Sequence, residues 1–280
     1  MQAALKNFKT LPVAACAHEA FEVLAGNLGS GILLLADHAT NHIPNEFNAL
    51  GLTETDLKRH IAYDIGVDSL VRDMAVHLGV PAVLSRFSRL LIDPNRGADD
   101  PTLVMRIADG ALIPGNARVD AAGVSARIAR FHQPYHATIA GLIDRALAQG
   151  IAPAIVSLHS FTPTMRGHSR PWHVGVLWDG DPRLATPLLQ RLRSEPDLVI
   201  GDNEPYDGAL AGDTIDQHAT DRGLSNCLVE LRQDLIGDTM SAQAWAKRLC
   251  QLLLPCFDAP EVGIVKHFKS RTRDRIRPHS

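Results

Sequence analysis

Several features are absent from this sequence of 280 residues, and each absence excludes a class of protein. The four cysteines, Cys16, Cys227, Cys250 and Cys256, form no Cys-x-x-Cys pair and no disulfide framework, which fits reduced thiols in the cytosol. No apolar run approaches the length of a membrane span, and the first six residues lack the charged and apolar regions of a signal peptide. We therefore expect a cytoplasmic protein with no membrane partner.

Positive charge is not in excess either, because the formal net charge is −3 at pH 7. This balance predicts no general affinity for nucleic acid. The charge is uneven, since residues 263–280 carry six lysine and arginine residues against one aspartate. We expect this basic tail to be solvated and frayed rather than bound to an acidic partner.

No Pro/Gly/Ser-rich linker, internal repeat or low-complexity run divides the chain. Hydrophobic residues make up 45% and charged residues 21% of the chain, and the mean hydropathy is −0.03. These values are typical of a globular protein with an ample core. The simplest interpretation is one α/β domain over residues 1–280.

Apolar runs of strand length alternate with helical patterns along the chain. Residues 17–26 suggest a short helix or an irregular lead-in, and residues 161–173 a loop. Proline at Gln133-Pro134 divides residues 120–149 into two successive helices. The alternation predicts a mostly parallel mixed sheet between two layers of helices. Strands are expected at 31–36, 80–85, 89–93, 153–158, 174–178, 198–200 and 226–232, and further helices at 53–77, 182–194 and 239–254.

Two of the predicted strands end in histidine. The run Leu33–Ala36 leads into His38, and residues 154–158 lead into His159. Ligands of open α/β sheets bind outside the carboxyl ends of the strands, and imidazole is the commonest metal ligand. His38 and His159 are therefore candidate metal ligands, although either one alone is better explained as a partly buried, hydrogen-bonded histidine.

A catalytic zinc site needs a third protein ligand, and its usual motifs are absent. Neither His-x-x-Glu nor His-Glu-x-x-His occurs, since Asn41 stands three residues after His38. Asp64 is the first candidate for the third ligand. The alternatives are Asp37, Asn41 and His42.

Glu230 lies within the apolar run Cys227–Leu231. Burial without a partner would raise its pKa, as a general base or acid requires, whereas an ion pair with Arg232 is the equally weighted alternative.

Arginine is placed to bind a carboxylate substrate, because its planar fork matches a carboxylate group. Arg89, Asn95 and Arg96 follow one another at the end of a predicted strand, where a salt bridge with Asp93 is the alternative interpretation. The loop 166–173 adds Arg170 and His173, and it could equally be a solvated surface loop.

Taken together, these segments resemble the N-formylglutamate amidohydrolase family over about residues 36–236. Each motif is weak alone, whereas their order and number are specific to the family. The segments are Asp-His-Ala-Thr-Asn-His-Ile-Pro (37–44), His-Ile-Ala-Tyr-Asp-Ile-Gly (60–66), Ser-Arg-Leu-Leu-Ile-Asp-Pro-Asn-Arg (88–96), Leu-His-Ser-Phe-Thr-Pro (158–163), Arg-Pro-Trp-His (170–173), Asn-Glu-Pro-Tyr (203–206) and Glu-Leu-Arg-Gln-Asp-Leu-Ile (230–236).

The resemblance implies a fold similar to the zinc carboxypeptidases, aspartoacylase and succinylglutamate desuccinylase. It also implies hydrolysis of an acidic N-acyl amino acid, most simply N-formyl-L-glutamate, with Zn2+ or another divalent metal as cofactor. By this resemblance His38 and His159 bind the metal, Glu230 is the general base and proton shuttle, and Asn95 and Arg96 hold a substrate carboxylate. Arg89 or a histidine of the loop 168–173 is a candidate donor to the oxyanion, and Arg170 and His173 are candidate substrate contacts.

Two other functions compete with this one. A hydrolase of the same fold could act on another N-acyl or N-carbamoyl amino acid or on a peptide end. A non-catalytic protein could use the arginines to bind a carboxylate ligand. The second is disfavoured because the sequence retains His38, His159 and Glu230. The sequence indicates neither the oligomeric state nor the physiological metal.

Overall fold

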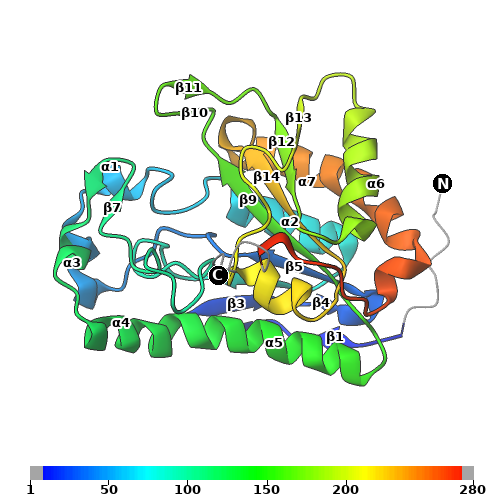
Figure 1. Ribbon diagram of the computed structural model, residues 1–280, viewed down its shortest axis with the longest axis horizontal. Coiled ribbons are helices and arrows are strands. Elements are labelled where there is room, and N and C mark those ends of the chain that lie inside the picture. Colours follow the sequence, from blue (N-terminus) through cyan, green and yellow to red (C-terminus); the bar gives the residue numbers. More distant parts are fainter. Residues whose placement is uncertain (1–8, 273–280) are drawn as a thin grey trace, which may run out of the picture.

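Eight strands form one mixed sheet at the centre of the computed structural model, which describes residues 9–272 (Figure 1). The strands β14, β9, β5 and β6 lie side by side and are parallel, and antiparallel pairs flank them. This arrangement confirms the predicted fold class. The order across the sheet is β13 (Ile200–Asp202), β12 (Val174–Leu177), β14 (Asn226–Arg232), β9 (Ala154–Phe161), β5 (Ile32–Ala36), β6 (Ala82–Ser85), β3 (Phe21–Leu24) and β2 (Cys16–Ala17).

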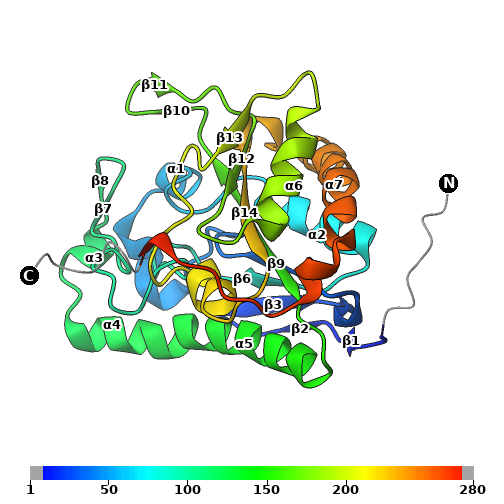
Figure 2. The same ribbon diagram turned by 45° about the vertical axis from the view of Figure 1, so that its right-hand side comes forward.

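Helices cover both faces of this sheet, which is why its central strands are apolar on both sides. Leu34 and Ala36 of β5 pack in one core with α2 (Val67–Leu78), α6 (Pro182–Arg193) and α7 (Thr239–Leu253). Leu33 and Leu35 point the other way and pack with α5 (Gln133–Ala148). Figures 1 and 2 show α5 and α4 (Ala121–Arg127) as one long rod below the sheet, on the opposite side from α2, α6 and α7.

Short elements complete the described chain. Strands β1 (Pro12–Val13) and β4 (Gly26–Asn27) pair, as do β7 (Ile107–Ala108) with β8 (Ala111–Leu112) and β10 (Thr164–Met165) with β11 (His168–Ser169). The short helices are α1 (Glu54–Leu57) and α3 (Pro114–Ala117), the π-helices Ile128–His132 and Asp216–Thr220, and the 3-10 turns Leu28–Ser30, Asn45–Gly51, Gln233–Leu235, Leu254–Asp258 and Pro260–Gly263.

Most expected elements are present with small shifts of their ends. The expected helix or lead-in at 17–26 is instead formed by β2, β3 and β4, because β3 pairs with β6. The strand expected at 198–200 lies at Ile200–Asp202. The loop expected at 161–173 contains the β10–β11 hairpin.

The single helix expected over 53–77 is also wrong, because residues 58–66 turn between α1 and α2. Gly66 begins α2 with a φ of +85°, and a Cβ there would lie 2.1 Å from the carbonyl oxygen of Ile236. Only glycine tolerates both constraints. The turn brings Asp64 beside the first histidine, since its N–H donates to the carbonyl of His38 (2.9 Å).

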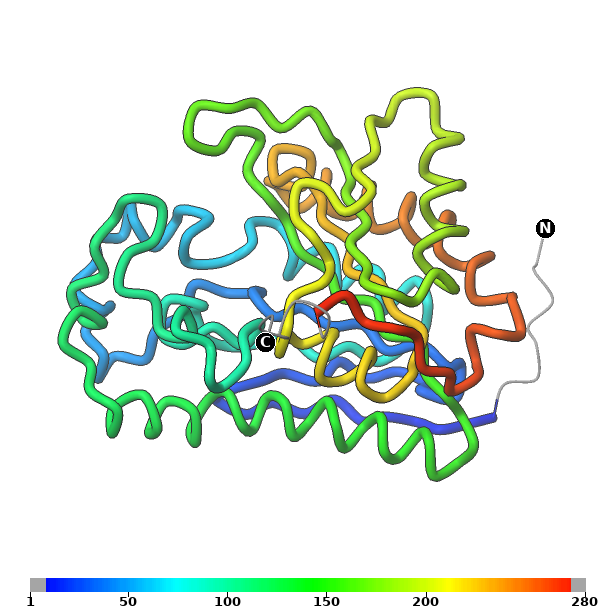
Figure 3. Tube along the Cα trace, in the orientation of Figure 1, coloured from blue at the N-terminus to red at the C-terminus, as the bar shows by residue number. Residues whose placement is uncertain are grey.

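Residues 89–93 form turns rather than the expected strand, and Figure 3 traces the backbone through them. Residues 90–93 are buried. One of their backbone bonds closes a local turn, since Leu91 N–H donates to the Ser88 carbonyl, and another reaches a later segment, since Asp93 N–H donates to the Leu103 carbonyl. A short apolar run of this kind does not distinguish a strand from a buried turn.

The basic tail is docked as far as the structure describes it, which differs from the expected frayed end. Ser270 and Thr272 are buried, and Arg271 pairs with Asp179 (3.3 Å) and Asp207 (2.9 Å). The rest of the tail, 273–280, and the first eight residues lie outside the described residues. All four cysteines are unpaired. No helix within residues 9–272 is both long enough and apolar enough to cross a membrane.

Candidate active site

The sheet register places the chemical groups at one edge of the sheet, on its α5 side. Glu230 of β14 is the direct neighbour of His159 on β9. Side chains alternate along a strand, so Asp37 continues the face that carries Leu35, and Glu230 the face that carries Leu228. His38 follows in the turn after β5. All of these polar side chains are buried, at 6% exposure or less.

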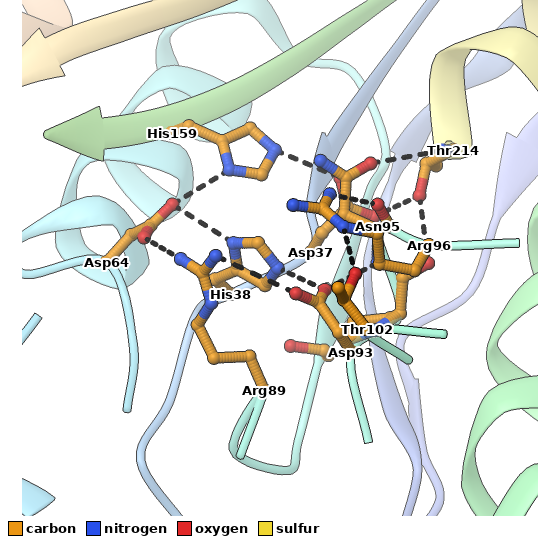
Figure 4. A network of polar contacts seen from close by, with 12 residues as sticks. Asp37, His38, Asp64, Arg89, Asp93, Asn95, Arg96, Thr102, His159 and Thr214 are labelled. Carbon is orange, nitrogen blue, oxygen red and sulfur yellow. Dashed lines mark hydrogen bonds and ion pairs between the residues drawn. The ribbon is translucent and has the colours of Figure 1, made fainter. Parts of the chain in front are cut away.

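Three of the predicted residues converge there, and Figure 4 shows them facing one another. One ligand atom each from His38, Asp64 and His159 lies within 4.8 Å of the other two. Asp64 Oδ2 is 3.4 Å from His38 Nδ1 and 2.8 Å from His159 Nδ1. No other group of three potential metal ligands of this kind occurs in residues 9–272.

Two further carboxylates orient these histidines from behind. His38 donates from Nε2 to Asp93 Oδ1 (2.7 Å), and His159 donates from Nε2 to Asp37 Oδ2 (3.1 Å). A carboxylate accepts hydrogen bonds, so in a neutral imidazole the opposite atom, Nδ1, presents its lone pair to Asp64. His38 Nδ1 is buried and makes no hydrogen bond within the described chain.

This arrangement gathers acceptor atoms around one point and therefore favours a positive charge there. Burial alone would lower the pKa of His159, but its hydrogen bonds with Asp37 and Asp64 raise it well above the ordinary value. The charge of His38 and the hydrogen bond with His159 hold the pKa of Asp64 well below its usual range despite burial. Two oriented imidazoles and a carboxylate fit a divalent cation such as Zn2+, since backing carboxylates are typical of metal-bound histidines.

Glu230 is buried beside this group without the ion pair that Arg232 could have supplied. Arg232 donates to Asp234 instead (Nε to Oδ1, 2.8 Å), and Glu230 Oε2 has no hydrogen-bond partner within the described chain. Burial raises the pKa of Glu230 to about 7. A carboxyl group that titrates near neutral pH is suited to accept and return a proton.

Arg89 contacts the group from the other side. Its Nη1 is 3.3 Å from Asp64 Oδ1 and its Nη2 is 3.7 Å from Asp93 Oδ2. The alternative drawn from the sequence, a salt bridge with Asp93, is thus partly present, and the guanidinium also faces the cavity.

A cavity of about 510 Å³ opens over these residues. It brings together His38, Asp64, Arg89, Asn95, Arg96, His159 and Glu230. Burial raises the pKa of Asp213, which also lines the cavity, to about 7, and burial lowers that of His60 to about 4. Part of its wall is apolar and is formed by Met105, Ile107, Leu177, Leu210, Ile215 and Leu228.

Asn95 and Arg96 lie on the loop that follows the buried turns. The backbone N–H of Thr214 donates to Asn95 Oδ1 (3.1 Å), so the amide NH2 of Asn95 is left for a ligand. Arg96 contacts the Asn95 carbonyl (Nη1, 2.7 Å) and Thr102 Oγ1 (Nε, 3.3 Å), as Figure 4 shows.

Arg170 and His173 do not line this cavity. Arg170 donates from Nη1 to the hydroxyl of Tyr206 (3.0 Å), which does line it. His173 Nδ1 accepts from Val199 N–H (2.8 Å) and thereby connects β12 to the segment before β13. Direct contact of these two side chains with substrate stays a prediction.

The alternatives for the third ligand lie elsewhere. Asp37 is on the far side of His159 and also accepts from Tyr135 and Thr214. Asn41 donates to the Leu57 carbonyl (2.8 Å), and His42 is exposed.

Sequence reasoning missed four residues at or behind this cavity: Asp93, as the support of His38, and His60, Tyr206 and Asp213 in the cavity wall. A signal existed for three of them, because His60, Asp93 and Tyr206 stand within the quoted motifs. Asp213 stands in none of them.

Comparisons with known proteins agree with this fold. A crystal structure of gene product Atu2144 from Agrobacterium tumefaciens is similar, with a TM-score of 0.80, 31% identity, and coverage of 86% of this chain and 96% of that one. N-formylglutamate amidohydrolase from Ralstonia eutropha JMP134 has a TM-score of 0.65 at 18% identity, with 88% and 100% covered, and so shares the fold. No curated protein matches the chain.

The fold is the one that the second neighbour, an N-formylglutamate amidohydrolase, also has. The family model for N-formylglutamate amidohydrolase matches residues 30–237. The chain therefore belongs to the N-formylglutamate amidohydrolase family, and the predicted family is confirmed.

Proposed function

We propose that the protein is a metal-dependent amidohydrolase that converts N-formyl-L-glutamate and water to formate and L-glutamate. Family membership supports amidohydrolase activity on a small molecule. The observation that carries the metal dependence is the orientation of His38 and His159. Each directs Nε2 to a carboxylate and Nδ1 to Asp64.

A divalent ion held by His38, Asp64 and His159 supplies Lewis acidity to the acyl carbonyl and to a water molecule. Glu230 takes a proton from the attacking water as its oxygen bonds to the formyl carbon. Glu230 then returns the proton to the nitrogen as the C–N bond breaks. Its buried position and a pKa of about 7 suit both steps.

Arg89, Asn95 and Arg96 account for binding of a negatively charged substrate. Asn95 and Arg96 hold a carboxylate of the amino acid through the amide NH2 and the guanidinium. Arg89, which lies beside Asp64 and lines the cavity, donates to the developing oxyanion. Specificity for an acidic substrate follows from these charges.

One observation favours a second candidate, hydrolysis of a larger N-acyl amino acid by the same residues. The cavity of about 510 Å³ is within the range for ligands larger than a formylated amino acid, and Leu177 and Leu228 line it close to Glu230. An apolar acyl group would cover these two side chains.

The test is formate release from N-formyl-L-glutamate by the protein as isolated, after chelation, and after Zn2+ is restored. We expect activity that chelation removes and Zn2+ restores. Activity that survives complete metal removal would overturn the metal dependence. No formate from folded, zinc-loaded protein would overturn the substrate, and N-acetyl- and N-phenylacetyl-L-glutamate would then test the second candidate.

A further inference from the structure

Outside the cavity, three histidines are buried together behind the loop that carries Asn95 and Arg96. We call His132, His136 and His218 the histidine cluster. They are 4%, 8% and 6% exposed, and their rings pack with centroids 4.2 Å (His132 to His136) and 5.1 Å (His136 to His218) apart. Figures 1 and 2 both place the π-helix Asp216–Thr220, which carries His218, beside the helical rod. That rod carries His132 and His136.

The hydrogen bonds determine which nitrogen of the central ring carries its proton. His136 Nε2 is 2.9 Å from the carbonyl oxygen of Pro94, which only accepts, so Nε2 is the donor. Nδ1 of neutral His136 then accepts from Nε2 of His218 (2.8 Å). His132 likewise donates from Nε2 to the carbonyl of Arg96 (2.9 Å).

Side chains therefore hold every carbonyl of the Pro94–Arg96 segment. His136 binds that of Pro94, the Arg96 guanidinium binds that of Asn95, and His132 binds that of Arg96. The segment belongs to no helix or strand, so these bonds replace a regular backbone network. They fix the peptide planes from which the side chains of Asn95 and Arg96 extend.

The cluster is not arranged as a metal site. Both nitrogens of His136 are in hydrogen bonds, and the described residues contain no metal-ligand group that includes it. Packing alone would be served better by apolar side chains, since buried imidazoles must be desolvated. His132 and His136 provide hydrogen bonds to the loop, and His218 provides one to His136, which apolar side chains could not do.

We propose that the histidine cluster is a positioning device that sets the affinity of Asn95 and Arg96 for the substrate carboxylate. His132 and His136 hold the loop directly, and His218 acts through His136 by keeping its Nε2 a donor. This inference rests on the proposed function, because it assumes that Asn95 and Arg96 bind the substrate.

The experiment compares leucine and glutamine at two positions of the cluster in the zinc-loaded protein. Glutamine can donate from a position close to Nε2, whereas leucine cannot. We expect His132→Leu and His218→Leu to raise KM for N-formyl-L-glutamate about tenfold with kcat changed less than threefold. His132→Gln and His218→Gln should stay within threefold of the wild type. Exposed His77→Leu on α2 is the matched control and should leave KM unchanged.

A double-mutant cycle separates positioning from general stability. If His132 acts through Arg96, His132→Leu should raise KM little further in an Arg96→Gln background. Fully additive effects, an unchanged KM in folded leucine variants, or loss of folding in both leucine variants would overturn the proposal. Absence of activity in the wild type would instead overturn the proposed function, so the two failures are distinguishable.

Discussion

Two groups of buried histidines lie on the same side of the sheet, and their neighbours differ. His159 lies between two carboxylates, and its hydrogen bonds with Asp37 and Asp64 raise its pKa despite burial. His136 lies between a carbonyl and another imidazole, and burial lowers its pKa to about 3. His159 and His136 are both buried, and their different neighbours nevertheless give them opposite preferences for charge.

The difference shows what each group can do. Acceptors on both sides of His159 favour a cation, whether a proton or a metal ion, at the centre of the cavity. One donor and one acceptor on opposite sides of His136 favour the neutral ring and fix its orientation. His38 and His159 are therefore suited to the chemical step, and the histidine cluster is suited to positioning the loop of Asn95 and Arg96. Four experiments test this difference.

The largest effect is expected at Glu230, which lies beside His159. Glu230→Gln keeps the shape and removes the proton acceptor, so kcat should fall by about 10²–10⁴-fold. Bound zinc, measured by mass spectrometry, should stay at the wild-type ratio because Glu230 is not in the ligand group. The exposed Glu261→Gln is the control. Full activity in folded Glu230→Gln would refute the role of general base.

The next effect concerns the carboxylate behind His38. Asp93→Asn weakens the acceptor for His38 Nε2 and should lower zinc affinity by about 10–100-fold, as measured by competition with a chelator. Asp181→Asn is a matched control, because this buried carboxylate pairs with Arg183. It should lower stability and leave zinc affinity unchanged. Equal affinities in the two variants would show that Asp93 does not support a metal ligand.

The sequence allowed prediction of the elements whose pattern is strictly local. Strand β14 occupies its expected range, and α6 and α7 each end within one residue of their expected ends. The apolar spacing of each element is uninterrupted, and an aspartate caps the start of each of the two helices. The errors at 53–77 and 89–93 arise from long-range contacts. Gly66 packs on Ile236, and Asp93 N–H bonds to Leu103, and neither contact is visible in local periodicity.

The site was predictable in part for a similar reason. His38, His159 and Glu230 end or interrupt apolar strands, and such positions are conspicuous in a sequence. Asn95 and Arg96 follow one another at the end of an expected strand, and both this placement and the resemblance to the family pointed to them. The histidine cluster escaped detection because His132 and His136 lie on a helical pattern, where histidine is unremarkable, and His218 is over 80 residues away.

The cluster also predicts how stability depends on pH. Burial lowers the pKa of His136 to about 3 and of His218 to about 4, both below the ordinary 6.5. Between about pH 4 and 6.5 the unfolded chain binds protons that the native chain does not, so stability falls as pH drops through this window. One such group lowers the free energy of unfolding at pH 5 by about 2 kcal/mol.

His218→Gln should therefore lose less stability than the wild type between pH 7 and pH 5. The measurement is denaturant unfolding of both proteins at the two pH values, at constant ionic strength and zinc. Taking the difference between proteins removes the opposite contribution of His159, whose raised pKa favours the native state in acid. An identical pH dependence in both proteins would show that His218 titrates normally. The contrast between His159 and the histidine cluster would then not extend to His218.

The smallest effect is expected at His173, which belongs to neither group. It is partly buried, and its Nδ1 accepts from the Val199 N–H rather than facing the cavity. His173→Gln removes the acceptor from that position, so the free energy of unfolding should fall by about 1 kcal/mol. KM and kcat for N-formyl-L-glutamate should change less than twofold. A tenfold rise in KM would mean that the 170–173 loop reaches the substrate. His173 would then contribute to substrate binding although it belongs neither to the metal-site histidines nor to the histidine cluster.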